Sequence, residues 1–182
     1  MSPRLAVTLN AIGLYAIGAV LLAAFAFQLI LNELPCPLCL LQRVGFVIVA
    51  VGPILTIRYG PHPSHYALSL LGAVAGAAFA IRQILLHIVP PDPGYGTALL
   101  GYHYYTWCFI VFAIAIVLCA LVLLFDEQFQ PIADWRPGAF EKVAVWAVIA
   151  VTLLNFGSTL LECGFTACPD NPEHYKLLYR QA

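Results

Sequence analysis

Residues 5–31 read LAVTLNAIGLYAIGAVLLAAFAFQLIL, a run of 27 positions without a charged side chain. An α-helix rises about 1.5 Å per residue, so about 20 apolar residues are enough to cross the hydrocarbon core of a bilayer. The apolar core of a signal peptide is shorter, at about 7–15 residues. We therefore expect this run to be a membrane-spanning helix and not a cleaved leader.

Four further runs that are mostly apolar follow. The predicted spans are residues 5–31, 38–57, 67–89, 102–125 and 143–161. The chain is 62% hydrophobic and only 9% charged, whereas soluble domains contain about 25% charged residues. Because lipid cannot satisfy the open edge of a sheet, the predicted fold class is all-α, an integral membrane helical bundle. We expect residues 1–182 to form one membrane domain, with a core four-helix bundle, an additional fifth span and a tail over 162–182.

The residues outside the spans indicate an orientation. The positive residues on the N-terminal side are Arg4, Arg58, Arg136 and Lys142. The opposite side carries Lys176, Arg180 and both close-spaced cysteine pairs. Positive residues favour the cytoplasm and disulfides persist outside it, so we expect a cytoplasmic N-terminus and an extracytoplasmic tail. The net charge of −1 and the lack of a basic cluster give no indication of nucleic-acid binding.

The stretch ELPCPLCLLQR, residues 33–43, places two cysteines at the start of the second span. Proline is favoured at the first helical position, so Pro37 makes Cys36 the cap of that helix. The partial positive charge of a helix N-terminus favours a thiolate, which favours a redox-active Cys36–Cys39 pair. A structural disulfide and a zinc site built with Cys163 and Cys168 are the alternatives. The pattern of a c-type haem requires histidine after the second cysteine, where this chain has Leu40.

Arg43 follows Cys39 by four residues, so the two share a helix face about one turn inside the span. An arginine within a membrane span indicates a functional site by default. It could hold a polar acceptor such as a quinone carbonyl, or stabilise a developing anion. The alternative is that its long side chain reaches up to the lipid headgroups.

Two further sets of residues lie on the same side of the predicted bundle. Gln83 and His87 share a face of the third span, where His87 could exchange protons beside a redox cofactor or be an ordinary interfacial residue. Cys163 and Cys168 enclose a short loop in the tail. An exposed disulfide there would be exchangeable, or it would only fix the tail in place.

Other residues within the spans predict packing. Gly72 and Gly76 have the GxxxG spacing of closely packed helices. Cys108 and Cys119 are too far apart along one helix to bond to each other, and we interpret them as packing residues.

The motif PCPLCLLQR, residues 35–43, resembles the disulfide bond formation protein B (DsbB) family, and the similarity covers the first four spans in order and spacing. The resemblance implies that Cys36 and Cys39 form the quinone-proximal disulfide and that Arg43 contacts the quinone. It also carries His87 over as a quinone-site residue. Well-known members have a second cysteine pair between spans three and four, but residues 90–101 here, PPDPGYGTALLG, contain none. Placing that pair at Cys163 and Cys168 resembles a DsbB-like subgroup with a cysteine-bearing tail.

The resemblance implies a protein-disulfide:quinone oxidoreductase of the bacterial inner membrane. Such an enzyme reoxidises a periplasmic thioredoxin-fold thiol oxidase (DsbA-like) and passes the electrons to ubiquinone or menaquinone in the surrounding lipid. In this scheme the catalytic cysteines are Cys36, Cys39, Cys163 and Cys168, and no metal is expected. Two alternatives stay open. Cys36–Cys39 could meet the partner directly, or the chain could be a non-enzymatic membrane scaffold with structural disulfides.

Overall fold

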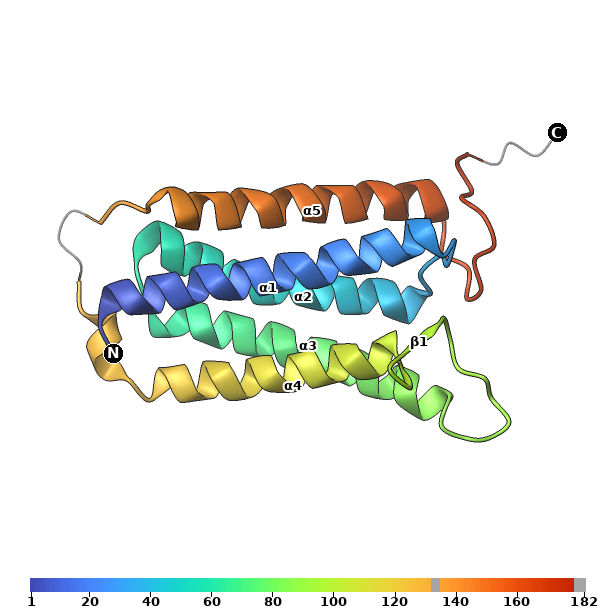
Figure 1. Cartoon of the computed structure of the whole chain (residues 1–182), viewed down its shortest axis with the longest axis horizontal. Coiled ribbons are helices and arrows are strands. Elements are labelled where there is room, and N and C mark those ends of the chain that lie inside the picture. The colour runs from blue at the N-terminus through green and yellow to red at the C-terminus, as the bar shows by residue number, and fades with distance from the viewer. Residues whose placement is uncertain (132–134, 179–182) are drawn as a thin grey trace.

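The computed structural model describes residues 1–131 and 135–178, and its five long helices run side by side (Figure 1). They are α1 (Pro3–Ile30), α2 (Pro37–Tyr59), α3 (Pro63–Leu86), α4 (Tyr104–Leu123) and α5 (Ala139–Cys163). The short elements are the antiparallel strands β1 (Ala98–Leu99) and β2 (Tyr102–His103), and the 3-10 turn η1 (Asp126–Phe129). All five helices are long and apolar enough to cross a membrane, which confirms the predicted all-α membrane bundle. Arg180 lies outside the described residues.

Three of the helices begin at a proline that follows a capping side chain. Ser2, Cys36 and His62 each accept a hydrogen bond from a backbone N–H in the first turn of α1, α2 and α3. Proline suits the first helical position because it has no N–H group to leave unsatisfied. The structure thus confirms the predicted start of the second helix at Pro37. Helices α3 and α5 begin before their apolar runs, because polar residues can continue a helix beyond the hydrophobic stretch.

The helices are arranged in the order α5, α1, α2, α3 and α4 across the bundle (Figure 1). One apolar cluster joins α1, α2 and α5 around Leu14, Ala50 and Val148. A second cluster joins α1, α2, α3 and α4, and in it the rings of Phe46 and Phe112 stack with their centroids 4.1 Å apart. Helix α5 therefore lies on the outside of α1, and one face of it is buried against the four-helix core.

The α2–α3 interface depends on glycine, as the GxxxG spacing predicted. A Cβ atom on Gly72 would lie 2.7 Å from the side chain of Ile48 and 2.9 Å from the backbone nitrogen of Val49. A Cβ atom on Gly76 would collide with the ring of Phe112. These two glycines therefore allow α3 to approach its neighbours more closely than any larger residue would.

Gly72→Ala is expected to lower the free energy of unfolding by about 1–3 kcal/mol, because the added methyl group must push α2 and α3 apart. Gly13→Ala is the matched control, since nothing lies within 4 Å of a Cβ atom at that position. Alanine has the higher helix propensity, so the control should be neutral or slightly stabilising. Unfolding in mixed detergent micelles measures both. An unchanged midpoint for Gly72→Ala would contradict the close approach.

Candidate functional site

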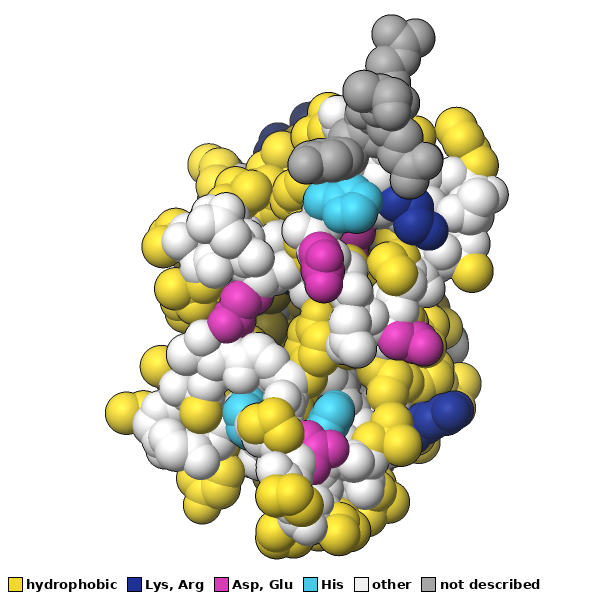
Figure 2. Space-filling view, turned by 90° about the vertical axis from the view of Figure 1, so that its right-hand side faces the viewer, with side chains coloured by type: hydrophobic (Ala, Val, Ile, Leu, Met, Phe, Trp, Pro, Cys, Tyr) yellow, Lys and Arg dark blue, Asp and Glu magenta, His cyan; other side chains and the backbone are white. Residues whose placement is uncertain are grey.

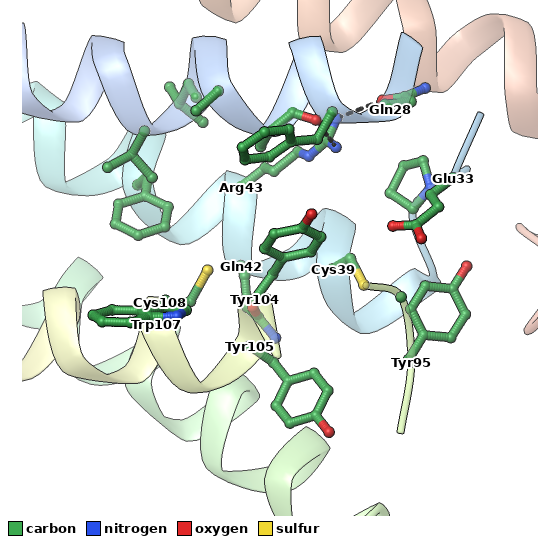
Figure 3. A pocket seen from close by; sticks show the side chains of 18 of the residues that line it. Gln28, Glu33, Cys39, Gln42, Arg43, Tyr95, Tyr104, Tyr105, Trp107 and Cys108 are labelled. Atoms are coloured by element: carbon green, nitrogen blue, oxygen red, sulfur yellow. Dashed lines mark hydrogen bonds between the residues drawn. The ribbon is translucent and has the colours of Figure 1, made fainter. Parts of the chain in front are cut away.

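A cavity of about 310 Å³ lies near the start of α2, where α1, α2 and α4 meet (Figure 3). The α1–α2 loop and the α3–α4 loop complete its wall. Most lining side chains are apolar, and they include Phe27, Phe46 and Trp107. The polar or sulfur-bearing lining residues are Gln28, Glu33, Cys39, Gln42, Arg43, Gln83, Tyr95, Tyr104, Tyr105 and Cys108. A wall whose surface is mostly apolar, with polar groups placed within it, is typical of a small-molecule site.

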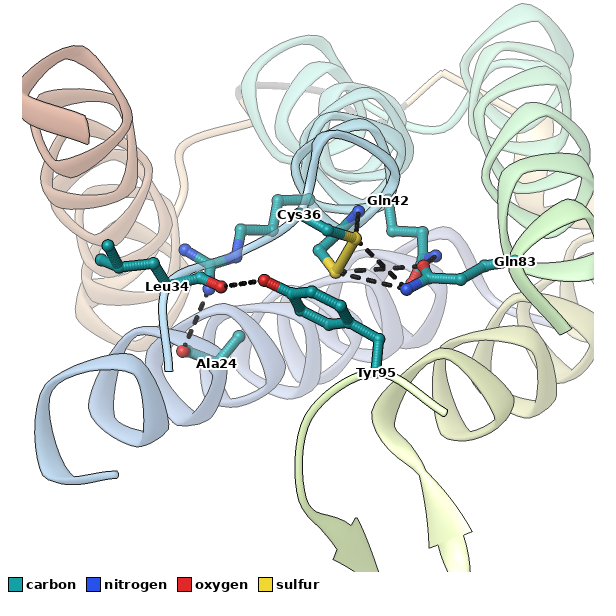
Figure 4. Close-up of a disulfide and its surroundings, with 8 residues drawn as sticks. Ala24, Leu34, Cys36, Gln42, Gln83 and Tyr95 are labelled. Atoms are coloured by element: carbon teal, nitrogen blue, oxygen red, sulfur yellow. Dashed lines mark hydrogen bonds between the residues drawn. A yellow bond between two sulfur atoms is a disulfide. The ribbon is translucent and has the colours of Figure 1, made fainter. Parts of the chain in front are cut away.

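Cys36 and Cys39 form a disulfide at the N-terminus of α2, beside this cavity (Figure 4). Cys36 caps the helix, with its Sγ atom accepting a hydrogen bond from the backbone N–H of Cys39 at 3.1 Å. Only 6% of the surface of Cys36 is exposed, whereas Cys39 lines the cavity. Of the two sulfurs, that of Cys39 is therefore the one that faces the space where a ligand would lie.

Gln83, a buried glutamine of α3, points its side-chain amide at both sulfurs of the disulfide (Figure 4). The Nε2 atom of Gln83 lies 3.2 Å from the Sγ atom of Cys36 and 3.5 Å from that of Cys39. Gln42 donates a hydrogen bond to the Oε1 atom of Gln83 at 2.7 Å, which fixes the orientation of the Gln83 amide. An N–H group aimed at the two sulfurs can stabilise the negative charge that develops on either of them.

Arg43 turns inward from α2 and joins three helices. Its Nη1 atom donates to the Oε1 atom of Gln28 and the Oδ1 atom of Asn155, both at 2.9 Å. Its Nη2 atom donates to the carbonyl oxygen of Ala24 at 3.1 Å. These acceptors are neutral, so they satisfy three of the N–H groups of the guanidinium without cancelling its charge, and they leave other N–H groups for a ligand. The wall of an apolar cavity thus carries a fixed positive charge.

The α3–α4 loop closes the mouth of the cavity and is tied to the α1–α2 loop. Glu33 accepts hydrogen bonds from the backbone N–H and the hydroxyl group of Thr97. The hydroxyl group of Tyr95 donates to the carbonyl oxygen of Leu34. Burial raises the pKa of Tyr95 to about 12, with Glu162 and Glu33 adding to the effect, so Tyr95 stays a neutral donor. The loop is therefore a built wall of the cavity.

Residues 6–95 match the family model described as Disulfide bond formation protein DsbB. The chain belongs to the DsbB family. The matched residues include α1, α2 and α3, and they contain Cys36, Cys39 and Arg43. They end before α4 and α5, so the Cys163–Cys168 pair lies outside the match.

Curated relatives agree with this membership. The Disulfide bond formation protein B of Chromobacterium violaceum is 38% identical over 79 residues, which cover 41% of this chain and 47% of the relative. That of Aromatoleum aromaticum is 34% identical over 86 residues, covering 44% and 52%. That of Burkholderia pseudomallei is 27% identical over 157 residues, covering 75% and 77%. The chain spans about half the length of the first two relatives, and no solved structure matches it.

Two of the site residues predicted from the DsbB resemblance, Cys39 and Arg43, line the cavity. Cys36 is bonded to Cys39 and lies behind it. His87 caps the C-terminus of α3 and lies 3.0 Å from the carboxylate of Asp92, so α3 presents Gln83 and not His87 to the cavity. The role of His87 stays a prediction.

Cys163 and Cys168 form the second disulfide, which closes the turn from α5 into the tail. Cys163 is buried, Cys168 is partly exposed, and Phe165 between them is 92% exposed. This turn lies at the same end of the bundle as the cavity. Figure 2 shows acidic and histidine side chains gathered there around a hollow.

Several residues of this DsbB-family site were missed by sequence reasoning. Gln28 and Gln42 are visible in the sequence as isolated polar positions within apolar runs, and that signal could have found them. Cys108 packs against the second apolar cluster, as predicted, and in addition it lines the cavity, which the sequence did not indicate. Tyr95 and the other loop residues carry no motif, because their position depends on how the loop folds back over α2.

Proposed function

We propose that this protein is a protein-disulfide:quinone oxidoreductase that reoxidises a thioredoxin-fold thiol oxidase of the DsbA type. The observation that carries the proposal is the arrangement of Cys39 and Arg43. A disulfide and a fixed positive charge line the same apolar cavity. Membership of the DsbB family supports the same reaction. An apolar cavity with a guanidinium donor fits a quinone, either ubiquinone or menaquinone.

The two thiols of the reduced pair supply all the electrons and protons that the reduction of a quinone requires. Cys36 and Cys39 lose two electrons and two protons as their disulfide forms, and a bound quinone supplies the acceptor for both and leaves as the quinol. Cys39 is the sulfur placed to deliver the electrons, since it lines the cavity. Arg43 would donate to a quinone oxygen and stabilise the charge that develops there. The side-chain N–H of Gln83 would stabilise a thiolate on either cysteine.

We further propose that the protein lies in the bacterial inner membrane with its N-terminus in the cytoplasm. In this orientation both disulfides are on the periplasmic side, where disulfides persist. The excess of positive residues on the N-terminal side supports it. The periplasmic partner then approaches the end of the bundle that Figure 2 shows.

The tail disulfide is proposed as the first acceptor of electrons from the partner. Its partly exposed Cys168 and the exposed turn around Phe165 make it accessible to a thiol. Exchange with the partner would reduce Cys163–Cys168, and a second exchange would reduce Cys36–Cys39. The alternative is that the tail pair only holds the tail against α5.

The double variant Cys163→Ser/Cys168→Ser separates these possibilities. We expect it to lose turnover with a reduced DsbA-type protein as donor, because the first exchange step has no disulfide. We also expect it to keep reducing ubiquinone-1 with dithiothreitol, which is small enough to reach Cys36–Cys39 directly. Absorbance of the quinone follows both reactions. Full turnover with the protein donor would assign the tail pair a structural role, and no turnover in the wild type with either donor would favour a scaffold.

A further inference from the structure

Glu162 is a carboxyl group enclosed inside the bundle. It lies in the last turn of α5, and its exposed surface is 0%. Within residues 1–131 and 135–178, neither of its carboxyl oxygens has a hydrogen-bond partner. Taking a carboxylate out of water costs several kcal/mol unless it is paired or hydrogen-bonded. Stability therefore does not explain why a carboxyl group lies at this position.

Glu162 continues a row of polar side chains along one face of α5. Asn155, Ser158 and Glu162 are spaced by three and four residues, so they share a face, and all three are buried. Asn155 accepts a hydrogen bond from Arg43. Ser158 accepts one from Gln28 at 2.7 Å, and Gln28 in turn accepts one from Arg43. The row therefore runs from the guanidinium on the cavity wall to the carboxyl group one turn beyond Ser158.

The charged and titratable groups around Glu162 come from three other parts of the chain. Helix α2 contributes Arg43, whose guanidinium lies at the other end of this polar row; no hydrogen bond or ion pair joins it to Glu162 within the described residues, so its charge acts on the carboxyl group across the row. The α3–α4 loop contributes Tyr95, and the tail contributes Tyr175, whose hydroxyl group accepts a hydrogen bond from Gln28. The backbone N–H of Lys176 donates to the backbone carbonyl oxygen of Glu162, and the ammonium group of Lys176 donates to Thr166 and Ala167 instead of to the carboxyl group. Helix α1 presents the neutral Gln28. Among the residues that the structure describes, Arg43 is thus the cation that acts on this carboxyl group.

Two opposing effects act on the proton of Glu162. Burial without a hydrogen bond favours the neutral acid, whereas the positive charge of Arg43 favours the carboxylate. Negative charge placed in the cavity beside Arg43 offsets the positive charge that Glu162 senses. The balance then moves toward the neutral acid. Binding of a proton to Glu162 and charge in the cavity are therefore linked, and the linkage acts in both directions.

We propose that Glu162 is a proton-binding site coupled through Arg43 to the charge in the cavity, so that electrons arriving in the cavity draw a proton onto Glu162. This inference rests on the proposed function only for the identity of the electron acceptor. Glu162 is a positioning residue for charge, since it acts on the cavity through Arg43. It adds nothing to the net reaction, because the two cysteine thiols release the two protons that a quinol requires. Glu162 holds a proton while the negative charge lasts and then releases it.

Infrared spectroscopy of the full chain in lipid nanodiscs tests the proton site without any activity. The carbonyl stretch of a protonated carboxyl group should be present near neutral pH in the wild type and lost in Glu162→Gln. The exposed Glu173 provides the matched control, and Glu173→Gln should keep the band. In Arg43→Gln the titration of the band should move to higher pH by about one unit or more, because the stabilising cation is gone. A band that is unaffected by Glu162→Gln, or whose titration ignores Arg43→Gln, would overturn the inference.

The pH profile of ubiquinone-1 reduction with dithiothreitol then tests the coupling to the reaction. In the wild type the rate constant of quinone reduction should fall as pH rises through the titration of Glu162. The carboxylate that forms offsets the positive charge of Arg43, which then stabilises negative charge in the cavity less. Glu162→Gln should remove that step from the profile, and Glu162→Asp should restore a step. An identical step in Glu162→Gln would contradict the coupling. If the wild type reduces no quinone, the proposed function fails, while the infrared titrations still decide the proton site.

Discussion

Cys39→Ala is expected to abolish reduction of ubiquinone-1, with dithiothreitol or with a reduced DsbA-type protein as the donor. The sulfur of Cys39 lines the cavity, while its partner Cys36 is 6% exposed and lies behind it. Without Cys39 the pair can neither form a disulfide nor deliver two electrons to the cavity. The loss should be complete, since the remaining thiol has no partner at this site.

The matched control is Cys119→Ala, which removes a free thiol of α4 that does not line the cavity. This variant should keep the wild-type rate. Cys36 and Cys39 are three residues apart and close only a small loop, so loss of their disulfide should destabilise the bundle less than loss of a disulfide that closes a long loop, and thermal unfolding should still show a folded variant. Quinone reduction by folded Cys39→Ala at more than a small fraction of the wild-type rate would rule out the proposed electron path.

Arg43→Gln is expected to raise the KM for ubiquinone-1 by about 10- to 100-fold, because a hydrogen bond to a charged group contributes about 1.5–3 kcal/mol. The rate constant at saturating quinone should fall as well, since Arg43 would stabilise charge that appears only during reduction. Arg43→Lys should recover part of both, because lysine keeps the charge but lacks the second nitrogen, which in Arg43 donates to Ala24 while the first donates to Gln28 and Asn155. Initial rates at varied quinone concentrations measure these changes.

Arg82→Gln is the control for Arg43→Gln. Arg82 also lies within a predicted span, but its side chain is exposed on α3 and is absent from the lining of the cavity. Its replacement should leave KM and kcat at the wild-type values. Equal effects of the two substitutions would mean that Arg43 acts only through general charge, and an unchanged KM in Arg43→Gln would remove it from the quinone site.

The architecture and one half of the site were predictable from the sequence because each depends on local patterns. Five apolar runs, each long enough to cross a bilayer, determine the five helices. Pro37 after Cys36 determines where α2 begins, and a spacing of four residues puts Arg43 on the same face as Cys39. Even the close approach at Gly72 follows from a local motif, because only glycine allows two helix backbones to come this near.

The other half of the site depends on contacts between helices that are distant in the sequence. The choice between Gln83 and His87 is an example. Gln83 lies within α3 and His87 caps its C-terminus, one turn further along the same face, so the depth at which α3 packs against α2 decides which one reaches the sulfurs. Asn155 is visible in the sequence only as a polar position within an apolar run, and its partner Arg43 is determined by the packing of α5 on α1.

By itself the sequence determined a five-helix membrane bundle with a reactive cysteine pair and an arginine at one end, since hydrophobic length, capping and helical periodicity are properties of neighbouring residues. Only the tertiary structure decided that Arg43 turns inward, that Cys39 faces an apolar cavity, and that Glu162 is enclosed one turn beyond the acceptors of Arg43. The physical reason is that burial and pairing of polar groups are set by the rotation and depth of each helix against the others, which no single segment encodes.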